Sequence, residues 1–397
     1  MKALVLGGCG AMGSETTRDL ARTSSFAEIV VADVDLAKAA AFCDSLGDKR
    51  LRAMSVDVTD VAGLVALFKE YDIVLNCTSY KFGLGITEAA IAAGRSMLDL
   101  GGLYNTPKQL DMDEKARAAG CTVLLGCGAT PGVTNLMARR GSEHMDEVEE
   151  IHVAFATFRA IAPSPGLLDT VMDEFSPGTK RFYFENGEFI ETAPFTGAKE
   201  VEFWSPVGKQ TTYFVPHSET RTMPRFFGPS LKRVDVRGCW RPETMEGLRT
   251  FNRFGLLETH PVKIAGAEIG PKQFLRECFL QYTAPTDDDE WAFLVNVEVV
   301  GRKGAQTVVA TYNLSHPPKS EWQFSCTAKV TGIPASIGAQ LLAAGRGNRA
   351  GVLAPEACFE PREFFAELAK RQILVHERVV SRQTFDAAPA QVPVGAK

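Results

Sequence analysis

A glycine-rich stretch near the N-terminus restricts the fold of this chain more than any other feature. Residues 8–13 read Gly-Cys-Gly-Ala-Met-Gly, which is a G-x-G-x-x-G pattern. The pattern directly follows the apolar run Met1–Leu6, and a helical pattern of apolar residues follows it. Asp33 closes the next apolar run, twenty residues after Gly13. This complete context predicts a strand–turn–helix unit whose turn binds the diphosphate of a dinucleotide.

Each position of the predicted turn has its own physical task. Gly8 is expected to permit the tight turn, and Gly10 to let the backbone approach the diphosphate with no Cβ in the way. Gly13 is expected to let the helix pack closely on the strand. Ala11 and Met12 are further candidate contacts, since the N-terminus of the following helix is expected to offer free N–H groups and a positive dipole end to the diphosphate.

The acidic residue after the second strand indicates which dinucleotide binds. Asp33 is expected to accept hydrogen bonds from the adenosine ribose and to repel a 2′-phosphate, so NAD is favoured over NADP. The alternative is a glycine turn of an unrelated α/β fold, with Asp33 merely solvated. Asp57 and Val58, at the end of the third expected strand, are candidate neighbours of the adenine. A carboxylate that caps the following loop is an equal alternative for Asp57.

Short apolar runs alternate with amphipathic helical stretches through residues 1–126, and Asp60 is a candidate helix N-cap. This alternation predicts right-handed crossovers and a doubly wound parallel sheet. Six strands complete a Rossmann domain. The expected strands are Met1–Leu6, Glu28–Ala32, Arg52–Val58, Asp72–Cys77, Ser96–Leu100 and Cys121–Gly126.

Small and polar residues follow the later strands of this predicted sheet. Ligands of doubly wound sheets lie beyond the carboxyl ends of the strands. Cys77 and Thr78 follow the fourth strand, Gly101 follows the fifth, and Gly128 and Pro131 follow the sixth. Small residues allow the backbone to pass close to a flat ring such as nicotinamide. These five residues are therefore candidate contacts of the cofactor.

The pattern changes to longer alternating runs after residue 126. Residues 127–331 predict a substrate-binding α+β domain with a mixed sheet, which contains a hairpin through 301–305 and a helix over 243–257. Residues 332–383 contain two helical patterns and a closing strand near 373–380. Residues 384–397 are rich in Ala and Pro and are expected to form a disordered tail.

Composition excludes several classes of partner. The net charge of −5 and the lack of a basic patch argue against nucleic acid and anionic membranes. No apolar run approaches the roughly 20 residues that a membrane span requires. The nine cysteines form no C-x-x-C pair and no Cys/His cluster. A cytoplasmic protein with free thiols and no metal site is the expected outcome.

The chain resembles the saccharopine dehydrogenase-like enzymes, and within them the lysine 6-dehydrogenases. The resemblance runs over nearly the whole chain, and it implies that the segment after residue 331 packs back against the nucleotide domain. The matching residues are Val5–Gly13, Ala32–Asp33, Val56–Val58, Leu98–Leu100, Gly126–Asn135, Thr331–Gly338 and Leu353–Glu356.

The resemblance implies NAD(P)-dependent oxidation of an amine carbon to an imine, or the reverse reduction. Amino acids, opine-like amines and polyamines are the substrates that it implies, and a homodimer formed through the second sheet is the implied assembly. Thr130, Thr134 and Asn135 stand where saccharopine reductases carry acidic and His residues, which disfavours saccharopine. Residues 165–167 also depart from the Thr-Trp-Ser stretch of the lysine enzymes, so lysine is one candidate among several.

Four residues are candidates for the chemistry itself. Tyr80 matches a tyrosine at the lip of the family's nicotinamide site, and Lys81 is expected to lower its pKa or to bind a carboxylate. Glu174, beside Asp173, is a candidate base or ammonium partner. Arg221 is a candidate clamp for an α-carboxylate. The alternatives are a loop aromatic with a solvated lysine, surface carboxylates, and an ion pair between strands.

Two loop histidines, His217 and His260, are interpreted as surface residues, because a histidine in a loop is more often exposed than catalytic. Three functions stay open. The first is a dehydrogenase that acts on the C–N bond of an amino acid or a related amine. The second is an opine or carboxynorspermidine type of reductase, which condenses an amine with a keto acid or aldehyde. The third is a non-catalytic NAD-binding protein.

Overall fold

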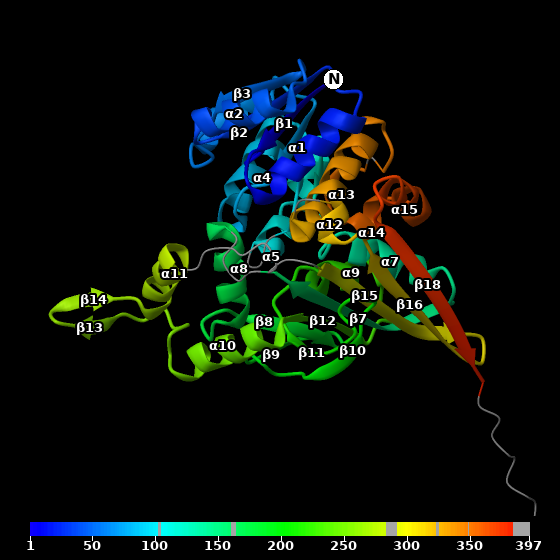
Figure 1. Cartoon of the computed structure of the whole chain (residues 1–397). Helices are drawn as coiled ribbons and strands as arrows, with labels where there is room; N and C mark the ends of the chain where they lie inside the picture. The colour runs from blue at the N-terminus through cyan, green and yellow to red at the C-terminus, as the bar shows by residue number, and fades with distance from the viewer. Residues whose placement is uncertain (102–104, 160–163, 283–291, 323–324, 348, 384–397) are drawn as a thin grey trace, which may run out of the picture.

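Two β-sheets organise the chain (Figure 1). The blue and cyan N-terminal strands lie at the top of the view, and the green, yellow and red strands lie below them. Two sequence expectations, the tail at 384–397 and the start of a strand at Trp291, lie outside the described residues. This computed structural model describes residues 1–101, 105–159, 164–282, 292–322, 325–347 and 349–383.

The first sheet has seven strands, all paired in parallel, in the order β17–β6–β5–β4–β1–β2–β3. The strand order reverses between β1 and β4, which is the switch point where doubly wound sheets bind ligands. The predicted Rossmann sheet is confirmed, and β17 is an additional strand that the sequence did not reveal. The strands are β1 (Lys2–Leu6), β2 (Glu28–Asp33), β3 (Leu51–Ser55), β4 (Ile73–Asn76), β5 (Ser96–Asp99), β6 (Thr122–Leu124) and β17 (Gly351–Leu353).

Both faces of this sheet are buried. Val5 and Leu98 point into one apolar core, whereas their neighbours Leu4 and Met97 point into the other. Helix α3 is capped as expected, because the Asp60 carboxylate accepts a hydrogen bond from a backbone N–H of its first turn. The helices of this part are α1 (Ala11–Thr23), α2 (Leu36–Leu46), α3 (Val61–Phe68), η1 (Tyr80–Phe82), α4 (Gly83–Ala93), α5 (Thr106–Leu110) and α6 (Asp113–Ala118).

The second sheet is mixed and has nine strands. Its main path is β10–β11–β12–β7–β15–β16–β18, and β8 and β9 extend from β12. Strand β12 pairs in parallel with β7, whereas β15 pairs antiparallel with β7. The strands are β7 (Glu147–Phe158), β8 (Arg181–Glu185), β9 (Glu188–Thr192), β10 (Lys199–Glu202), β11 (Lys209–Phe214), β12 (Arg233–Trp240), β15 (Ala292–Lys303), β16 (Gln306–Ser315) and β18 (Leu374–Arg382).

Nine helices are described outside the Rossmann unit, and they include the expected helix near 243–257. They are α7 (Val133–Ser142), α8 (Pro165–Phe175), α9 (Glu219–Phe227), α10 (Pro242–Arg253), α11 (Pro271–Tyr282), α12 (Lys319–Trp322), α13 (Cys326–Ala343), α14 (Pro355–Cys358) and α15 (Pro361–Ala369).

The C-terminal segment joins the two parts of the molecule. Helix α13 packs against α1, where the Thr16 hydroxyl donates to the Gly332 carbonyl over 2.9 Å. Asp19 of α1 pairs with Arg371 at 2.7 Å and accepts a hydrogen bond from Ser336 at 2.6 Å. These contacts are buried, so removing one partner would leave an uncompensated charge. The C-terminal segment thus contacts α1, the helix that follows the glycine turn.

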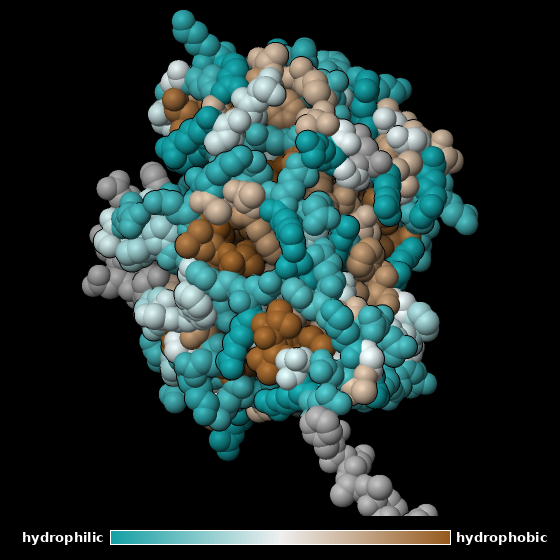
Figure 2. Space-filling model, turned by 90° about the vertical axis from the view of Figure 1, so that its right-hand side faces the viewer, coloured by the Kyte–Doolittle hydropathy of each residue, from teal (hydrophilic) through white to brown (hydrophobic). Residues whose placement is uncertain are grey.

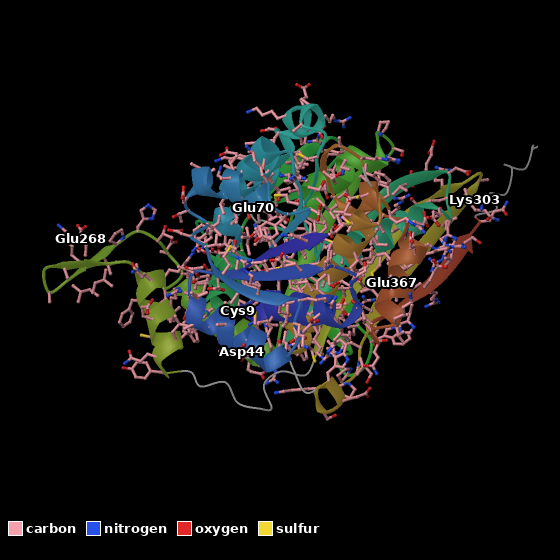
Figure 3. All side chains as sticks on the ribbon, turned by 90° about the horizontal axis from the view of Figure 1, so that it is seen from above. Cys9, Asp44, Glu70, Glu268, Lys303 and Glu367 are labelled. Carbon is pink, nitrogen blue, oxygen red and sulfur yellow. The ribbon has the colours of Figure 1, made fainter. Side chains whose placement is uncertain are left out.

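One small hairpin projects from the body. Strands β13 (Val262–Ile264) and β14 (Ala267–Ile269) pair only with each other among the described strands, and Glu268 lies on this projection in Figure 3. Helix α11 connects the hairpin to α8 through ion pairs. The projection is therefore attached next to the helix that carries Glu174.

The helices can be compared with a membrane span by their length and hydropathy. In the part of the chain that the structure describes, none of the helices combines the length and hydropathy that a span requires. On the face shown in Figure 2, apolar residues gather in separate patches with polar residues between them.

Candidate active site

A cleft of about 630 Å³ opens at the carboxyl ends of the parallel strands. Its walls come from both parts of the molecule. The glycine turn and the loops after β2 to β5 form one end. Helix α8 and residues of β7, β12 and β15 form the other. This is the location expected for the ligand of a doubly wound sheet. The size fits the range of small-molecule sites.

The glycine turn is built as a cradle, with one difference from the expectation. Gly7, not Gly8, is the left-handed residue of the turn, with φ of 68°. Gly8 serves another purpose, because a Cβ there would lie 2.9 Å from the Val5 carbonyl oxygen. A Cβ at Gly13 would lie 2.1 Å from the Gly7 carbonyl oxygen. Gly10, by contrast, lines the cleft.

Ala11 and Met12 also line this end of the cleft, at the N-terminus of α1. Backbone N–H groups in the first turn of a helix have no partner within the helix, so they are available to an anion. The turn therefore fits a diphosphate on steric and electrostatic grounds, although Gly8 and Gly13 act by packing and do not line the cleft.

Asp33, Asp57 and Val58 line the end of the cleft beyond the turn. The Asp33 carboxylate accepts hydrogen bonds from the thiol of Cys9 at 3.1 Å and from the backbone N–H two residues later at 3.2 Å. Lys38 lines the same end, so a cation that the sequence reasoning did not consider is present there.

The Asp57 side chain has a structural task as well. Its carboxylate accepts hydrogen bonds from the hydroxyl and the backbone N–H of Thr59 at 2.7 and 2.9 Å. The hydroxyl contact, followed by the backbone one, lowers the pKa of Asp57. Asp57 therefore caps the loop, and it also lines the cleft, where its place beside the adenine stays a prediction.

The loops after β4, β5 and β6 meet in the middle of the cleft. Cys77, Thr78, Gly101 and Pro131 line it, whereas Gly128 does not. The Gly128 N–H donates to the Pro131 carbonyl over 2.9 Å and so closes the turn. Gly101 has φ of 100°, and a Cβ there would lie 2.6 Å from Pro131 Cγ. Small residues therefore allow these loops to pack on one another.

Tyr80 lines the cleft, and its hydroxyl donates to the Asp173 carboxylate of α8. Lys81 does not reach the site. It is exposed and lies 3.5 Å from Asp169, so the expectation that it acts on Tyr80 or on a substrate carboxylate is wrong for this structure. The reason is that α8 offers two carboxylates one helical turn apart, and each binds one of the two neighbouring side chains.

Glu174 is buried and lines the cleft, as its proposed role requires, whereas Arg221 lies elsewhere. The Arg221 guanidinium lies 3.8 Å from the ring centre of Phe189 and 4.5 Å from that of Phe182. Helix α9 directs it toward the β8–β9 hairpin, so the predicted carboxylate clamp at Arg221 is wrong for this structure. A different arginine, Arg159 at the end of β7, lines the cleft.

His217 lies in the cleft with its side chain only 9% exposed, so its interpretation as a surface residue is wrong. It lines the cleft, with Nε2 at 3.5 Å from Glu174 Oε1 and Nδ1 at 3.5 Å from Glu219 Oε2. Burial on its own lowers the pKa of the imidazole, but the two carboxylates outweigh it and raise the pKa to about 9. The two flanking carboxylates therefore favour the protonated form of the ring at neutral pH.

The two glutamates differ in their own charge state. Glu219 accepts hydrogen bonds from the hydroxyls of Thr130 at 2.6 Å and Thr134 at 3.0 Å. Burial raises the pKa of Glu219, but His217 and Thr130 outweigh it and the net pKa is lowered. Burial instead dominates at Glu174 and raises its pKa. The cluster thus holds an ion pair and a second carboxyl group that takes up a proton more readily.

An aromatic wall surrounds this cluster. The ring of Phe155 lies 5.1 Å from that of His217, 5.6 Å from that of Trp240 and 6.1 Å from that of Phe293, between centres. All four side chains line the cleft. Within the described ranges, no group of three or more His, Cys, Asp or Glu side chains is arranged to hold a metal ion.

Comparisons with known proteins agree with this architecture. A family model described as the saccharopine dehydrogenase NADP binding domain matches residues 3–124, and one described as the saccharopine dehydrogenase C-terminal domain matches residues 128–374. Apo saccharopine dehydrogenase (L-Glu forming) from Saccharomyces cerevisiae has a similar fold, with a TM-score of 0.71, 18% identity, and coverage of 96% of this chain and 99% of that one.

Two sequence relatives cover much of the chain. A carboxyaminopropylagmatine dehydrogenase from Synechocystis is 24% identical over 97% of this chain and 100% of its own length. A carboxynorspermidine synthase from Vibrio alginolyticus is 27% identical over 77% of each chain. A nicotinamide dinucleotide is thus the supported class of cofactor.

The cradle predicts a steric effect on cofactor binding. The substitution Gly13→Ala places a Cβ against the Gly7 carbonyl, so it is expected to raise the Kd for NADH by about tenfold or more, which is roughly 1.4 kcal/mol. Fluorescence titration measures this value. The matched control is Gly247→Ala in α10, where the nearest atom lies 3.8 Å away, and it should bind like the wild type. Equal Kd values for all three proteins would contradict a diphosphate site at the turn.

Proposed function

The chain belongs to the saccharopine dehydrogenase family of oxidoreductases acting on C–N bonds, and on this premise we propose that it joins a primary amine to an aldehyde by reduction, with NADH as the reductant. The relatives aligned over most of the chain support this direction, since their names describe amines that carry a carboxylated arm. The oxidation of a single amine, such as lysine, is the second candidate, because the buried Glu174 offers an acceptor for an ammonium group.

The observation that carries the proposal is the His217 ring in the cleft, which lies 3.5 Å from the carboxylates of both Glu174 and Glu219. Reductive joining of an amine and an aldehyde begins with addition, which gives a carbinolamine. Water then leaves, and this step needs a proton on the departing oxygen. His217 holds such a proton at neutral pH, between Glu174 and Glu219. The hydroxyl oxygen takes that proton and leaves as water, which forms the C=N bond.

The nitrogen keeps its own proton when water leaves, so the C=N group is protonated and the reaction is complete when its carbon has gained one hydride. The cofactor, when bound, supplies the hydride. Glu219 keeps the imidazole ring oriented and charged, because Thr130 and Thr134 fix the position of its carboxylate. The aromatic side chains of the wall keep bulk water from the C=N bond, which would otherwise hydrolyse. Solvent returns the proton that His217 has given up.

The residues at the dinucleotide end support NAD as the proposed cofactor. Asp33 lies in the cleft where the adenosine ribose is expected, and a carboxylate there favours the two free hydroxyls of NAD. Gly10, Ala11 and Met12 hold the diphosphate in this proposal, Asp57 and Val58 lie near the adenine, and Cys77, Thr78, Gly101 and Pro131 lie near the nicotinamide.

Several finer statements belong to the same proposal. We propose a homodimer that works in the cytoplasm, and the nine free cysteines support a reducing compartment. We also propose residues 1–126 as the NAD-binding domain, 127–331 as the substrate and dimerisation domain, and 332–383 as the returning segment.

Substrate mixtures test the proposed reaction directly. We expect the enzyme to oxidise NADH when agmatine or 1,3-diaminopropane is supplied together with L-2-amino-4-oxobutanoate, and not with either compound alone. NADH fluorescence measures the rate. Reduction of NAD by lysine alone would support the second candidate instead. Tight binding of NADH with no turnover in any mixture would contradict both.

The pH profile tests the role of the imidazolium. The reductive kcat/KM should fall as the pH rises through about 9, since the acid form of His217 is lost there. The substitution Glu219→Gln removes a carboxylate that stabilises this acid form, so the midpoint should move down by about one pH unit. His260→Asn, at an exposed position, is the control that should leave the profile unchanged. A midpoint that does not respond to Glu219→Gln would show that another group limits the rate.

The choice of cofactor depends on a single carboxylate in this account. Replacing Asp33 by Ser together with Val34→Arg should raise kcat/KM for NADPH and lower it for NADH, with a change in their ratio of about 100-fold or more. Initial rates with both cofactors measure the ratio. If the double variant keeps the wild-type ratio, Asp33 does not contact the ribose, and Lys38 becomes the residue to replace next.

A further inference from the structure

Two buried polar atoms of the cleft wall have no hydrogen-bond partner among the described residues. They are Glu174 Oε2 and Trp240 Nε1. Each of these residues is only 3% exposed. The Glu174 oxygen is an acceptor and needs a donor from the ligand, whereas the Trp240 N–H can only donate and needs an acceptor.

An unpaired buried polar group is costly, since it loses its bonds to water and gains none in return. Both atoms belong to the same region of the wall. The Trp240 ring lies 5.3 Å from that of Phe175, the neighbour of Glu174, and 5.6 Å from that of Phe155. Phe155 in turn lies 5.1 Å from the His217 ring. A ligand in this region therefore meets a donor and an acceptor across an apolar, aromatic surface.

The charges of the wall identify the type of ligand group. Aromatic faces and a carboxylate together attract an ammonium group. Arg159, which is 4% exposed, also lines the cleft, and its charge is close enough to lower the pKa of Glu174 against the larger effect of burial. A guanidinium and an indole N–H both favour an oxygen anion. The wall thus offers one place for a cation and one for an anion.

We propose that this wall binds the amino-acid head of one substrate arm, with the α-ammonium at Glu174 Oε2 and the α-carboxylate at Trp240 Nε1, in the cleft that Arg159 also lines. This inference rests on the proposed reaction and assigns the arm that enters the second domain. Pro131 and Gly101, where the nicotinamide is proposed to lie, line the same cleft. Trp240 becomes a specificity residue, since its N–H distinguishes arms that carry a carboxylate from arms that do not.

Two probes that differ only in the carboxylate test this assignment. They are L-2,4-diaminobutyrate and 1,3-diaminopropane, each titrated by calorimetry into the full-length enzyme with NAD present. The wild type should bind the diaminobutyrate at least about tenfold more tightly. The substitution Trp240→Phe keeps the ring and deletes the N–H, so it should weaken diaminobutyrate about tenfold and leave diaminopropane unchanged.

Two further variants complete the test. Glu174→Gln removes the charge with little change of shape, so it should weaken both probes. Trp204→Phe is the matched control, because Trp204 stacks on His376 outside this cleft and its replacement should change neither affinity. Equal affinity of the wild type for both probes, or an unaltered preference in Trp240→Phe, would overturn the assignment and indicate that a bound water satisfies the indole.

The rate of NADH oxidation with an amine and an aldehyde, measured on the same proteins, separates the two proposals. Turnover by a wild type that shows no carboxylate preference would overturn only the assignment of the amino-acid head. Absence of turnover, together with absence of binding of either probe, would overturn the proposed reaction as well.

Discussion

The structure of the site depends on one buried cation and the two carboxylates that face it. An imidazolium cannot remain inside a protein unless nearby charges offset its lost hydration. His217 has Glu174 on one side and Glu219 on the other, each at 3.5 Å. Two threonine hydroxyls, which come from the turn after β6 and from the start of α7, hold Glu219 in place. The charge cluster therefore forms only where the nucleotide sheet and the second domain meet.

Helix α8 connects this junction between the two parts to the rest of the cleft. Its Asp173 accepts a hydrogen bond from Tyr80, and its Asp169 pairs with Lys81, so the loop after β4 is held against the second domain. Two basic residues of α11 pair with the same carboxylates from the other side. The next residue of the helix after Asp173 is Glu174, which contacts His217. Tyr80 thus joins the loop after β4 to α8, and its role in the chemistry stays a prediction.

Local chemistry was predictable from the sequence, whereas side-chain partners from distant segments were not. The glycine turn, the six strands and Asp33 follow from spacing within a few tens of residues, and the structure places them as expected. The tight turn was assigned to Gly8 and belongs to Gly7, since the pattern does not show which glycine takes the positive φ. Strand β17 escaped notice because it has three residues and lies far along the chain.

The errors at the catalytic end have the same origin. The sequence around His217 is typical of a loop, and a loop histidine is predicted to be exposed. Its two partners are Glu174 and Glu219, and Glu219 is itself bound by Thr130. Only the fold brings these partners to the histidine. The one local signal of this pair is the carboxylate of Glu219, two residues after the histidine. Arg221 was chosen for its residue type, but the direction of α9 places it on the aromatic rings of a hairpin. Residue type predicts chemistry only when the direction of the side chain is known.

The protonation state of His217 is the most direct test of this account. Nitrogen NMR on histidine-labelled enzyme, with the signal assigned by comparison with a His217→Asn variant, reports whether each ring nitrogen carries a proton. The account predicts a doubly protonated ring at pH 7.5 that loses its proton with a midpoint near 9. A neutral ring at pH 7.5 would contradict it, because the cleft would then lack the buried acid on which the proposed reaction depends.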